Sequence, residues 1–255
     1  MVAFKTPREL EIMRAAGQVV ARTLERVARA AAPGVALAEL DAIGARSIKE
    51  HDAKPSFLHY HPRWAAAPYP GTLCLSVNDI VVHGIPDGRL LEAGDILSID
   101  CGAVVGGYHG DAAITIPIGT VDDAATRLLD VTRQALREGV AAAVPGNRIG
   151  DISHAVESVG RAAGYGILRG CTGHGIGTAM HEDPTVPNTG RPRRGLRLRE
   201  GLTIAIEPML IEGGHDGGRN LPDGWAIATA DGSRAAHFEH TIAVTADGPV
   251  ILTVP

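Results

Sequence analysis

The stretch LEAGDILSIDCGAVVGGYHGDAAITI, which spans Leu91–Ile116, has the pattern of a β-hairpin. Apolar and β-branched runs at Asp95–Ile99 and Ala112–Ile116 flank a glycine-rich middle, a pattern typical of two strands joined by a tight turn. We place a two-residue turn at Val105-Gly106. The hairpin is the segment from which the rest of the fold is predicted.

This turn would set Asp100 directly opposite Asp111. Two facing carboxylates destabilise a strand pair, and in a half-buried site they cannot both ionise cheaply. A cation between them removes both costs, and oxygen ligands suit a hard or borderline divalent metal. The alternative is that the register differs and each aspartate ends a strand in solvent. The hairpin alone leaves both interpretations open.

The composition is that of an ordinary soluble globular protein. The chain has 255 residues, 45% hydrophobic and 21% charged, and its net charge of −5 argues against a DNA-binding role. Its three cysteines are scattered without a CxxC pair, which favours a reducing compartment over a disulfide framework. No apolar signal core or membrane-length apolar window is present. We therefore expect a cytoplasmic protein with no membrane contact.

Capping and Pro-Gly signals predict four helices. Thr6, Pro7 and Glu9 form a capping-box start, and Pro-Gly pairs end two of the helical patterns. The predicted helices cover about 7–32, 37–51, 122–143 and 149–163. Further strands are predicted near 72–77, 80–83, 203–210, 225–229 and 236–245, the last two joined by a turn at Asp231-Gly232.

The chain also repeats itself once, weakly. Each half contains a helix ended by Pro-Gly, a His-Gly-Ile triplet, an acid that ends an apolar strand and an acid that opens the next strand. The matched positions are Pro33 with Pro145, His83 with His174, Asp100 with Glu207 and Asp111 with Glu239. Four matches in the same order predict one domain of two pseudo-symmetric halves, about 1–120 and 121–255, which share a central site.

The repeat thus collects four acids and one histidine: Asp100, Asp111, Glu207, Glu239 and His174. Acids at apolar strand ends cannot lie together uncompensated, and arginine is absent from these strands. The set has too much oxygen for a structural zinc site. It fits a two-metal hydrolase, in which ions about 3.5–4 Å apart hold a hydroxide that attacks a carbonyl while an acid carries a proton to the leaving amine.

Six motifs, in order, resemble those of the type I methionine aminopeptidases: VVHGIP at 81–86, IDCGAVVGGYHGD at 99–111, GHGIG at 173–177, MHEDP at 180–184, IEPM at 206–209 and FEHT at 238–241. That family has the pita-bread fold, an α+β architecture of two pseudo-symmetric halves with a curved antiparallel sheet covered by helices. The resemblance spans nearly the whole chain and implies a single catalytic domain, residues 1–255.

The resemblance also implies a role for each ligand. Asp100 would chelate one metal ion, and Asp111 and Glu239 would bridge both ions. His174 and Glu207 would hold the other ion, and Glu207 would also carry a proton. The two divalent ions could be cobalt, manganese, iron or zinc, because ligand types this permissive do not select one.

Substrate contacts follow from the same resemblance. His83 and His181 would contact substrate and stabilise the tetrahedral intermediate. The methionine side chain would lie in a pocket of soft and aromatic side chains: Tyr69, Cys74, Met180 and Trp225. The segment 59–69 departs from the family pattern, with Ala66 where an aromatic is common and Trp64 as its possible replacement.

The remaining histidines have no motif or spacing that singles them out. We interpret them as ordinary structural or surface residues: His59, His61, His109, His154, His215, His237 and His240. Cys171 is interpreted as a buried small residue. A basic run from Arg191 to Arg199 is either a solvated face or a contact for ribosomal RNA.

The predicted activity is removal of the initiator methionine from nascent proteins and peptides whose second residue is small. The chain is expected to act as a monomer, with at most a transient ribosome contact. One alternative is an Xaa-Pro aminopeptidase or dipeptidase, which normally has an extra N-terminal domain; only about 90 residues precede the hairpin. A second is a non-catalytic binding protein on the same fold, but such relatives usually lose metal ligands.

Overall fold

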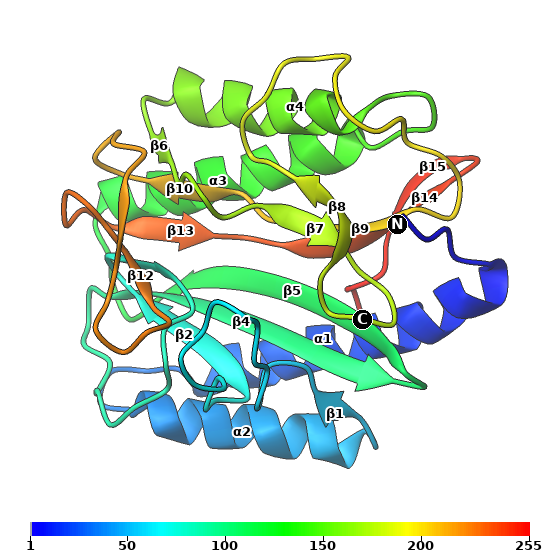
Figure 1. Cartoon of the computed structure of the whole chain (residues 1–255). Helices are drawn as coiled ribbons and strands as arrows, with labels where there is room; N and C mark the ends of the chain where they lie inside the picture. The colour runs from blue at the N-terminus through cyan, green and yellow to red at the C-terminus, as the bar shows by residue number, and fades with distance from the viewer. Residues whose placement is uncertain (1) are drawn as a thin grey trace.

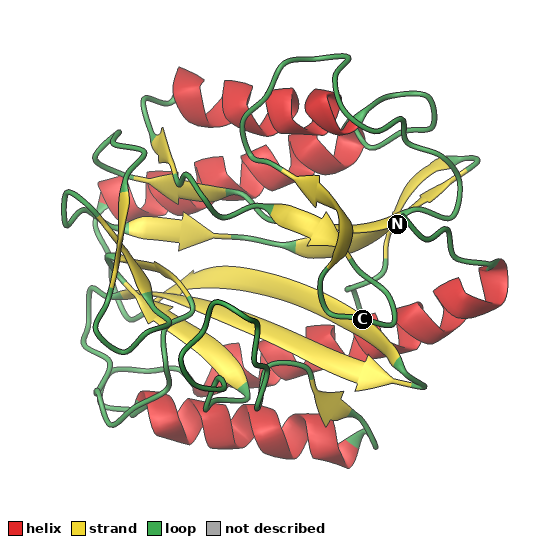
Figure 2. Cartoon of the chain, in the orientation of Figure 1, coloured by secondary structure: helices red, strands yellow, loops and turns green. Residues whose placement is uncertain are grey.

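Two pairs of helices enclose the strands in the computed structural model, which describes residues 2–255 (Figures 1 and 2). Helices α1 and α2 lie on one side, and α3 and α4 lie on the other. Their bounds are α1 Pro7–Ala30, α2 Leu37–Glu50, α3 Asp123–Ala141 and α4 Ile149–Ala162. Each helix lies within two residues of its predicted bounds. Across residues 2–255, no helix has the length and apolar character needed to cross a lipid bilayer.

The strands pair antiparallel, so the architecture is the predicted α+β class. Their bounds are β1 Lys54–Pro55, β2 Leu73–Val77, β3 Ile80–Val82, β4 Ile96–Val105, β5 Tyr108–Pro117, β6 Gly166–Ile167, β7 Gly173–Gly175, β8 Glu182–Val186, β9 Thr203–Ile206, β10 Met209–Ile211, β11 Gly218–Asn220, β12 Ile227–Thr229, β13 Ala235–His237, β14 His240–Thr245 and β15 Gly248–Ile251.

Helix α1 begins with the predicted capping box. The Thr6 hydroxyl accepts from the Glu9 backbone N–H at 3.4 Å, and the Glu9 carboxylate accepts from the Thr6 backbone N–H at 2.7 Å. These bonds satisfy backbone donors that the first turn would otherwise leave free. The apolar face of α1, including Val20 and Leu24, then packs with Ile99 of β4 in one buried cluster. Helices α3 and α4 form a second cluster with β9 and β10.

The hairpin exists, but its predicted register is wrong. Strands β4 and β5 pair through to Val105 opposite Tyr108, so the turn is Gly106-Gly107 and not Val105-Gly106. Both glycines have positive φ, 57° and 86°, which the favoured two-residue hairpin turn demands at both central positions. Val105 is β-branched and meets that demand poorly.

The corrected register changes the relation between the two aspartates. Asp111 lies opposite Gly102, and Asp100 lies opposite Ala113. The two carboxylates are therefore diagonal neighbours on one face of the sheet rather than a directly opposed pair. They still project to the same side, because residues two apart on a strand share a face.

In the second half, two predicted continuous strands are each interrupted. The segment predicted at 203–210 breaks at Glu207-Pro208 between β9 and β10, and the segment predicted at 236–245 breaks at Phe238-Glu239 between β13 and β14. The register is the same on both sides, with Ile206 opposite His240 in β9–β14 and Met209 opposite His237 in β10–β13. Glu207 therefore lies across from Glu239 at the break.

The turn at Asp231-Gly232 does not close a hairpin. Strand β12 pairs with β11 and β3, whereas β13 pairs with β10. The turn therefore carries the chain from one sheet to another.

A seam of hydrogen bonds joins the two halves along β5 and β14, which run side by side in Figure 1. The Glu239 N–H donates to the Ala113 carbonyl at 2.9 Å. The Thr241 hydroxyl accepts from the Asp111 N–H at 3.0 Å and donates to the Asp111 carbonyl at 2.8 Å. This seam places Asp111 of the first half next to Glu239 of the second.

Candidate metal centre

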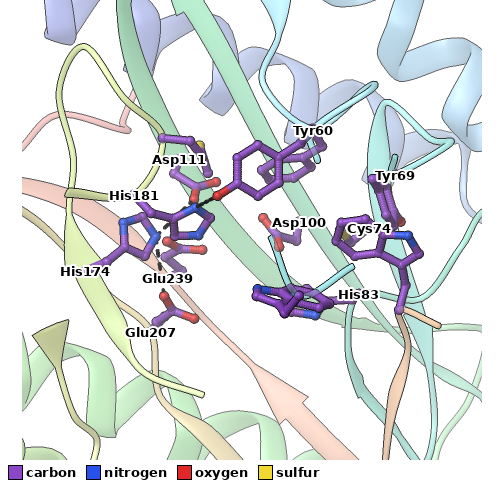
Figure 3. A pocket seen from close by; sticks show the side chains of 14 residues that line it. Tyr60, Tyr69, Cys74, His83, Asp100, Asp111, His174, His181, Glu207 and Glu239 are labelled. Atoms are coloured by element: carbon purple, nitrogen blue, oxygen red, sulfur yellow. Dashed lines mark hydrogen bonds and ion pairs between the residues drawn. The ribbon is translucent and has the colours of Figure 1, made fainter. Parts of the chain in front are cut away.

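One pocket collects every residue that the sequence predicted for the site (Figure 3). It is lined by Phe57, Tyr60, Trp64, Tyr69, Cys74, His83, Asp100, Asp111, His174, Met180, His181, Glu207, Trp225 and Glu239. His174, Glu207 and Glu239 gather on one side, Tyr69 and Cys74 lie on the other, and Asp100 lies between them. Phe57 and Tyr60 are additions that the sequence analysis missed.

Local backbone structure explains how the acids reach the pocket. Asp100 and Asp111 project from one face of the β4–β5 hairpin. Glu207 and Glu239 occupy the two strand breaks, where Pro208 has no N–H to continue a ladder. Two acids therefore come from the hairpin of the first half and two from the strand breaks of the second half.

The ligand atoms of Asp111, His174 and Glu239 all lie within 4.8 Å of one another. His174 Nε2 is 3.7 Å from Asp111 Oδ2 and 3.6 Å from Glu207 Oε1. His174 Nδ1 is 2.9 Å from the Gly175 carbonyl oxygen, to which it donates in the tautomer that leaves the Nε2 lone pair free. A backbone carbonyl on the second ring nitrogen is the usual support of a metal-binding histidine.

Buried polar atoms without a hydrogen-bond partner mark the same place. Among the side chains of residues 2–255, these atoms are His83 Nδ1, Asp100 Oδ1, Asp111 Oδ1, His237 Nε2 and Glu239 Oε1. An unpartnered buried polar atom is costly and rare in a folded protein. No lysine or arginine lines the pocket to compensate these carboxylates. Several carboxylate oxygens and an imidazole that converge without a protein cation fit divalent metal ions.

The acidic side chains of the pocket are costly to ionise, because they are buried and close to one another. Burial raises the pKa of Asp100 well above its ordinary value, and the charges of Asp111 and Glu207 raise it further. Burial likewise raises the pKa of Glu239, and it raises the pKa of Glu207 to about 8. These carboxyl groups therefore tend to retain protons until a cation replaces them.

Two histidines at the pocket are neutral at physiological pH. Burial lowers the pKa of His83 to about 4 and the pKa of His181 to about 3. The rings of His181 and His174 lie 4.2 Å apart, and His181 Nδ1 is 2.8 Å from Tyr60 Oη. Neutral imidazoles can donate a hydrogen bond to a substrate oxygen without adding charge to the site.

The apolar side of the pocket is a cluster of aromatic and sulfur-containing residues. Tyr69, Cys74, Met180 and Trp225 pack together there. Trp225 meets Tyr69 edge-on at 5.0 Å and Trp64 at 5.1 Å, and Trp64 is 64% exposed. The aromatics that reach the pocket from the divergent segment are Tyr60, Trp64 and Tyr69, whereas Ala66 is exposed and does not line it.

His237, which the sequence analysis interpreted as an ordinary structural or surface residue, is buried beside two of the proposed ligands. The residue is 2% exposed, and its Nε2 lies 3.7 Å from Glu207 Oε2 and 3.9 Å from Glu239 Oε2. Burial lowers the pKa of His237 to about 3, so its ring is neutral. Its place two residues before Glu239 was the one sequence signal that could have found it.

Comparison with known proteins shows that the chain is similar to one family of metallopeptidases. The model of metallopeptidase family M24 matches residues 11–246. Methionine aminopeptidase 1 of Mycobacterium tuberculosis is 50% identical over 100% of this chain and 96% of its own length. The crystal structure of methionine aminopeptidase from Thermotoga maritima superposes with a TM-score of 0.95 at 40% identity, covering 100% of both chains.

A more distant structure shares the fold alone. The prolidase from Pyrococcus furiosus superposes with a TM-score of 0.77 at 22% identity, covering 99% of this chain and 65% of the prolidase. Both full-length matches given above are thus to methionine aminopeptidases. The chain belongs to metallopeptidase family M24 and, within it, to the type I methionine aminopeptidases of the pita-bread fold.

Proposed function

We propose that this chain removes the N-terminal methionine from nascent proteins and peptides whose second residue is small, with two divalent metal ions. The observation that carries the proposal is the group of unpartnered buried carboxylates beside a pocket of soft and aromatic side chains. The preference for a small second residue rests on the family resemblance.

The proposed ligands divide between the two ions. Asp111 and Glu239, which the β5–β14 seam brings together, would contact both ions. Asp100 would complete the site of one ion, and His174 with Glu207 would complete the other. When bound, the metal ions supply a Lewis acid for the scissile carbonyl and lower the pKa of a water molecule. Cobalt, manganese, iron and zinc all accept such ligands.

The remaining polar residues would bind and orient the substrate and move protons. His83 and His181 are neutral and line the pocket, so each can donate an N–H to the carbonyl oxygen as negative charge develops there. Glu207 is the proposed proton carrier to the leaving amine nitrogen. The thioether of the substrate methionine would contact Tyr69, Cys74, Met180 and Trp225, because sulfur and aromatic rings attract one another.

A peptide assay tests the proposal. Met-Ala-Ser should release methionine when Co²⁺ or Mn²⁺ is added to metal-free protein, and a chelator should abolish the release. Ala-Pro peptides should not be cleaved, whereas an Xaa-Pro peptidase would cleave them and a binding protein would cleave neither. Absence of metal-dependent methionine release would refute the proposal.

We also propose that the basic run binds ribosomal RNA transiently and that the protein works in the cytoplasm as a monomer. Arg191, Arg193, Arg194, Arg197 and Arg199 are all exposed. Arg193 and Arg197 line a polar hollow together with Arg148. Such a cluster can neutralise several phosphates, and binding of this kind weakens steeply as salt rises.

Co-sedimentation with ribosomes should therefore decline as the salt concentration is raised, and replacing the five arginines with serine should remove it. Co-sedimentation that does not change with salt concentration, or no co-sedimentation at low salt, would exclude the contact with ribosomal RNA. Size-exclusion chromatography with light scattering should report a mass near 26.5 kDa, and cell fractionation tests the compartment.

A further inference from the structure

His237 is held rigidly at the end of β13. The Thr115 hydroxyl accepts from the His237 backbone N–H at 2.9 Å and donates to the His237 carbonyl at 2.7 Å. This pair of bonds ties His237 to β5 across the seam between the halves. With its backbone fixed and its side chain 2% exposed, the ring has little freedom to turn elsewhere.

The ring of His237 faces a carboxylate that lies between two imidazoles. Glu207 Oε1 is 3.6 Å from His174 Nε2, and Glu207 Oε2 is 3.7 Å from His237 Nε2. His237 Nε2 is buried and has no hydrogen-bond partner. The next acid, Glu239, is slightly farther from it at 3.9 Å. Each carboxylate oxygen of Glu207 therefore faces a different histidine.

We propose that His237 is a positioning residue, whose Nε2–H donates to Glu207 Oε2 and so directs Glu207 Oε1 to the metal ion beside His174. The inference deepens the proposed function, since it assigns His237 a task at a proposed metal ligand. A closure of the 3.7 Å separation to about 2.9 Å makes the bond, and such bonds tighten when a site is loaded.

Direct metal ligation by His237 is the competing role, and the geometry disfavours it. All five proposed ligands line the pocket in which they converge, and His237 does not line it. A ligating carboxylate, in turn, needs a donor on its free oxygen to hold its orientation. His237 is the histidine that faces Glu207 Oε2.

Two variants separate the roles. His237→Gln keeps an N–H donor of similar reach, whereas His237→Leu keeps the volume and removes the donor. We expect His237→Leu to weaken Co²⁺ affinity, measured by calorimetry, by about 10–100-fold and to lower kcat by a similar factor with little change in KM. His237→Gln should stay within about threefold of the wild type. If the leucine variant does not fold, His237→Asn replaces it, because its amide is too short to reach Glu207.

His240→Gln is the matched control. His240 is a neighbouring histidine whose Nδ1 lies 2.9 Å from the Thr253 hydroxyl rather than at the pocket, and its replacement should not change Co²⁺ affinity. Wild-type Co²⁺ affinity in the leucine variant would overturn the inference. Equal loss in both His237 variants, with a changed Co²⁺ absorption spectrum, would instead make His237 a ligand. Because calorimetry needs no turnover, the inference is tested even if the wild type releases no methionine.

Discussion

Replacement of Glu239 with glutamine or alanine should abolish metal binding and methionine release while the protein stays folded. Glu239 Oε1 is buried without a partner, and the residue shares a 4.8 Å group with Asp111 and His174. A neutral amide cannot compensate two cations as a carboxylate does. We expect kcat/KM to fall by more than about 100-fold, the upper end of the loss caused by residues that only orient a ligand.

The fold should survive because the bonds of Glu239 to β5 come from its backbone. Its N–H donates to Ala113, and that bond does not depend on the side chain. Metal-free Glu239→Gln should melt at or above the wild-type temperature, since a neutral amide is easier to bury than a carboxylate. Glu212→Gln, whose carboxylate pairs with Arg234 away from the pocket, is the control with normal activity. Retained activity in Glu239→Gln would show that the proposed bridging role is wrong.

The stabilisation of this protein by metal should grow as pH rises. Without metal, burial raises the pKa of Glu207 to about 8, and it raises the pKa of Asp100 and Glu239 above their ordinary values. A group whose pKa is higher in the folded state than in the unfolded chain stabilises the fold when the pH is below its pKa in the unfolded chain. That stability is lost as pH rises through the folded value. For Glu207 the window runs from about 4.5 to about 8.

Metal ions take the place of those protons. The stabilisation by metal is therefore largest at a pH where the carboxyl groups of the metal-free protein have lost their protons. The difference in melting temperature between Mn²⁺-loaded and chelator-treated protein should therefore widen steadily from pH 5 to pH 8. His174 acts in the same direction. Burial tends to lower its pKa, but Asp111 and Glu207 together raise it above the ordinary value. A constant or narrowing difference would contradict the expected linkage, and in Glu239→Gln the difference should be small at every pH.

The sequence predicted the hairpin well but misplaced its turn by one residue. The apolar and β-branched runs located both strands, because short runs of this kind bounded by turn residues are typical of buried strands. The turn was decided by backbone geometry instead, since only Gly106-Gly107 supplies two residues that tolerate positive φ. The direct opposition of Asp100 and Asp111, from which a metal was first argued, does not exist.

The internal repeat compensated for that error. It identified Glu207 and Glu239 by position in the chain, and in the structure these two acids are the ones that lie across from each other. The repeat was found from the order of the motifs in the chain, so the error in the strand register did not affect it. Its reading of the five ligands, like their individual roles, stays a prediction until metal is bound and measured.

The sequence by itself determined the four helices and the two strands of the hairpin, because caps, Pro-Gly stops and apolar patterns act over a few residues. The ligands were predicted from the internal repeat, and the other pocket residues from the family resemblance. The tertiary structure alone decided the strand breaks, the contributions of Phe57 and Tyr60, and the orientation of His237 toward Glu207. Those features depend on contacts such as the bonds between Thr241 and Asp111, 130 residues apart in the chain. Contacts at that separation are set by packing of the two halves, and packing leaves no period in the sequence.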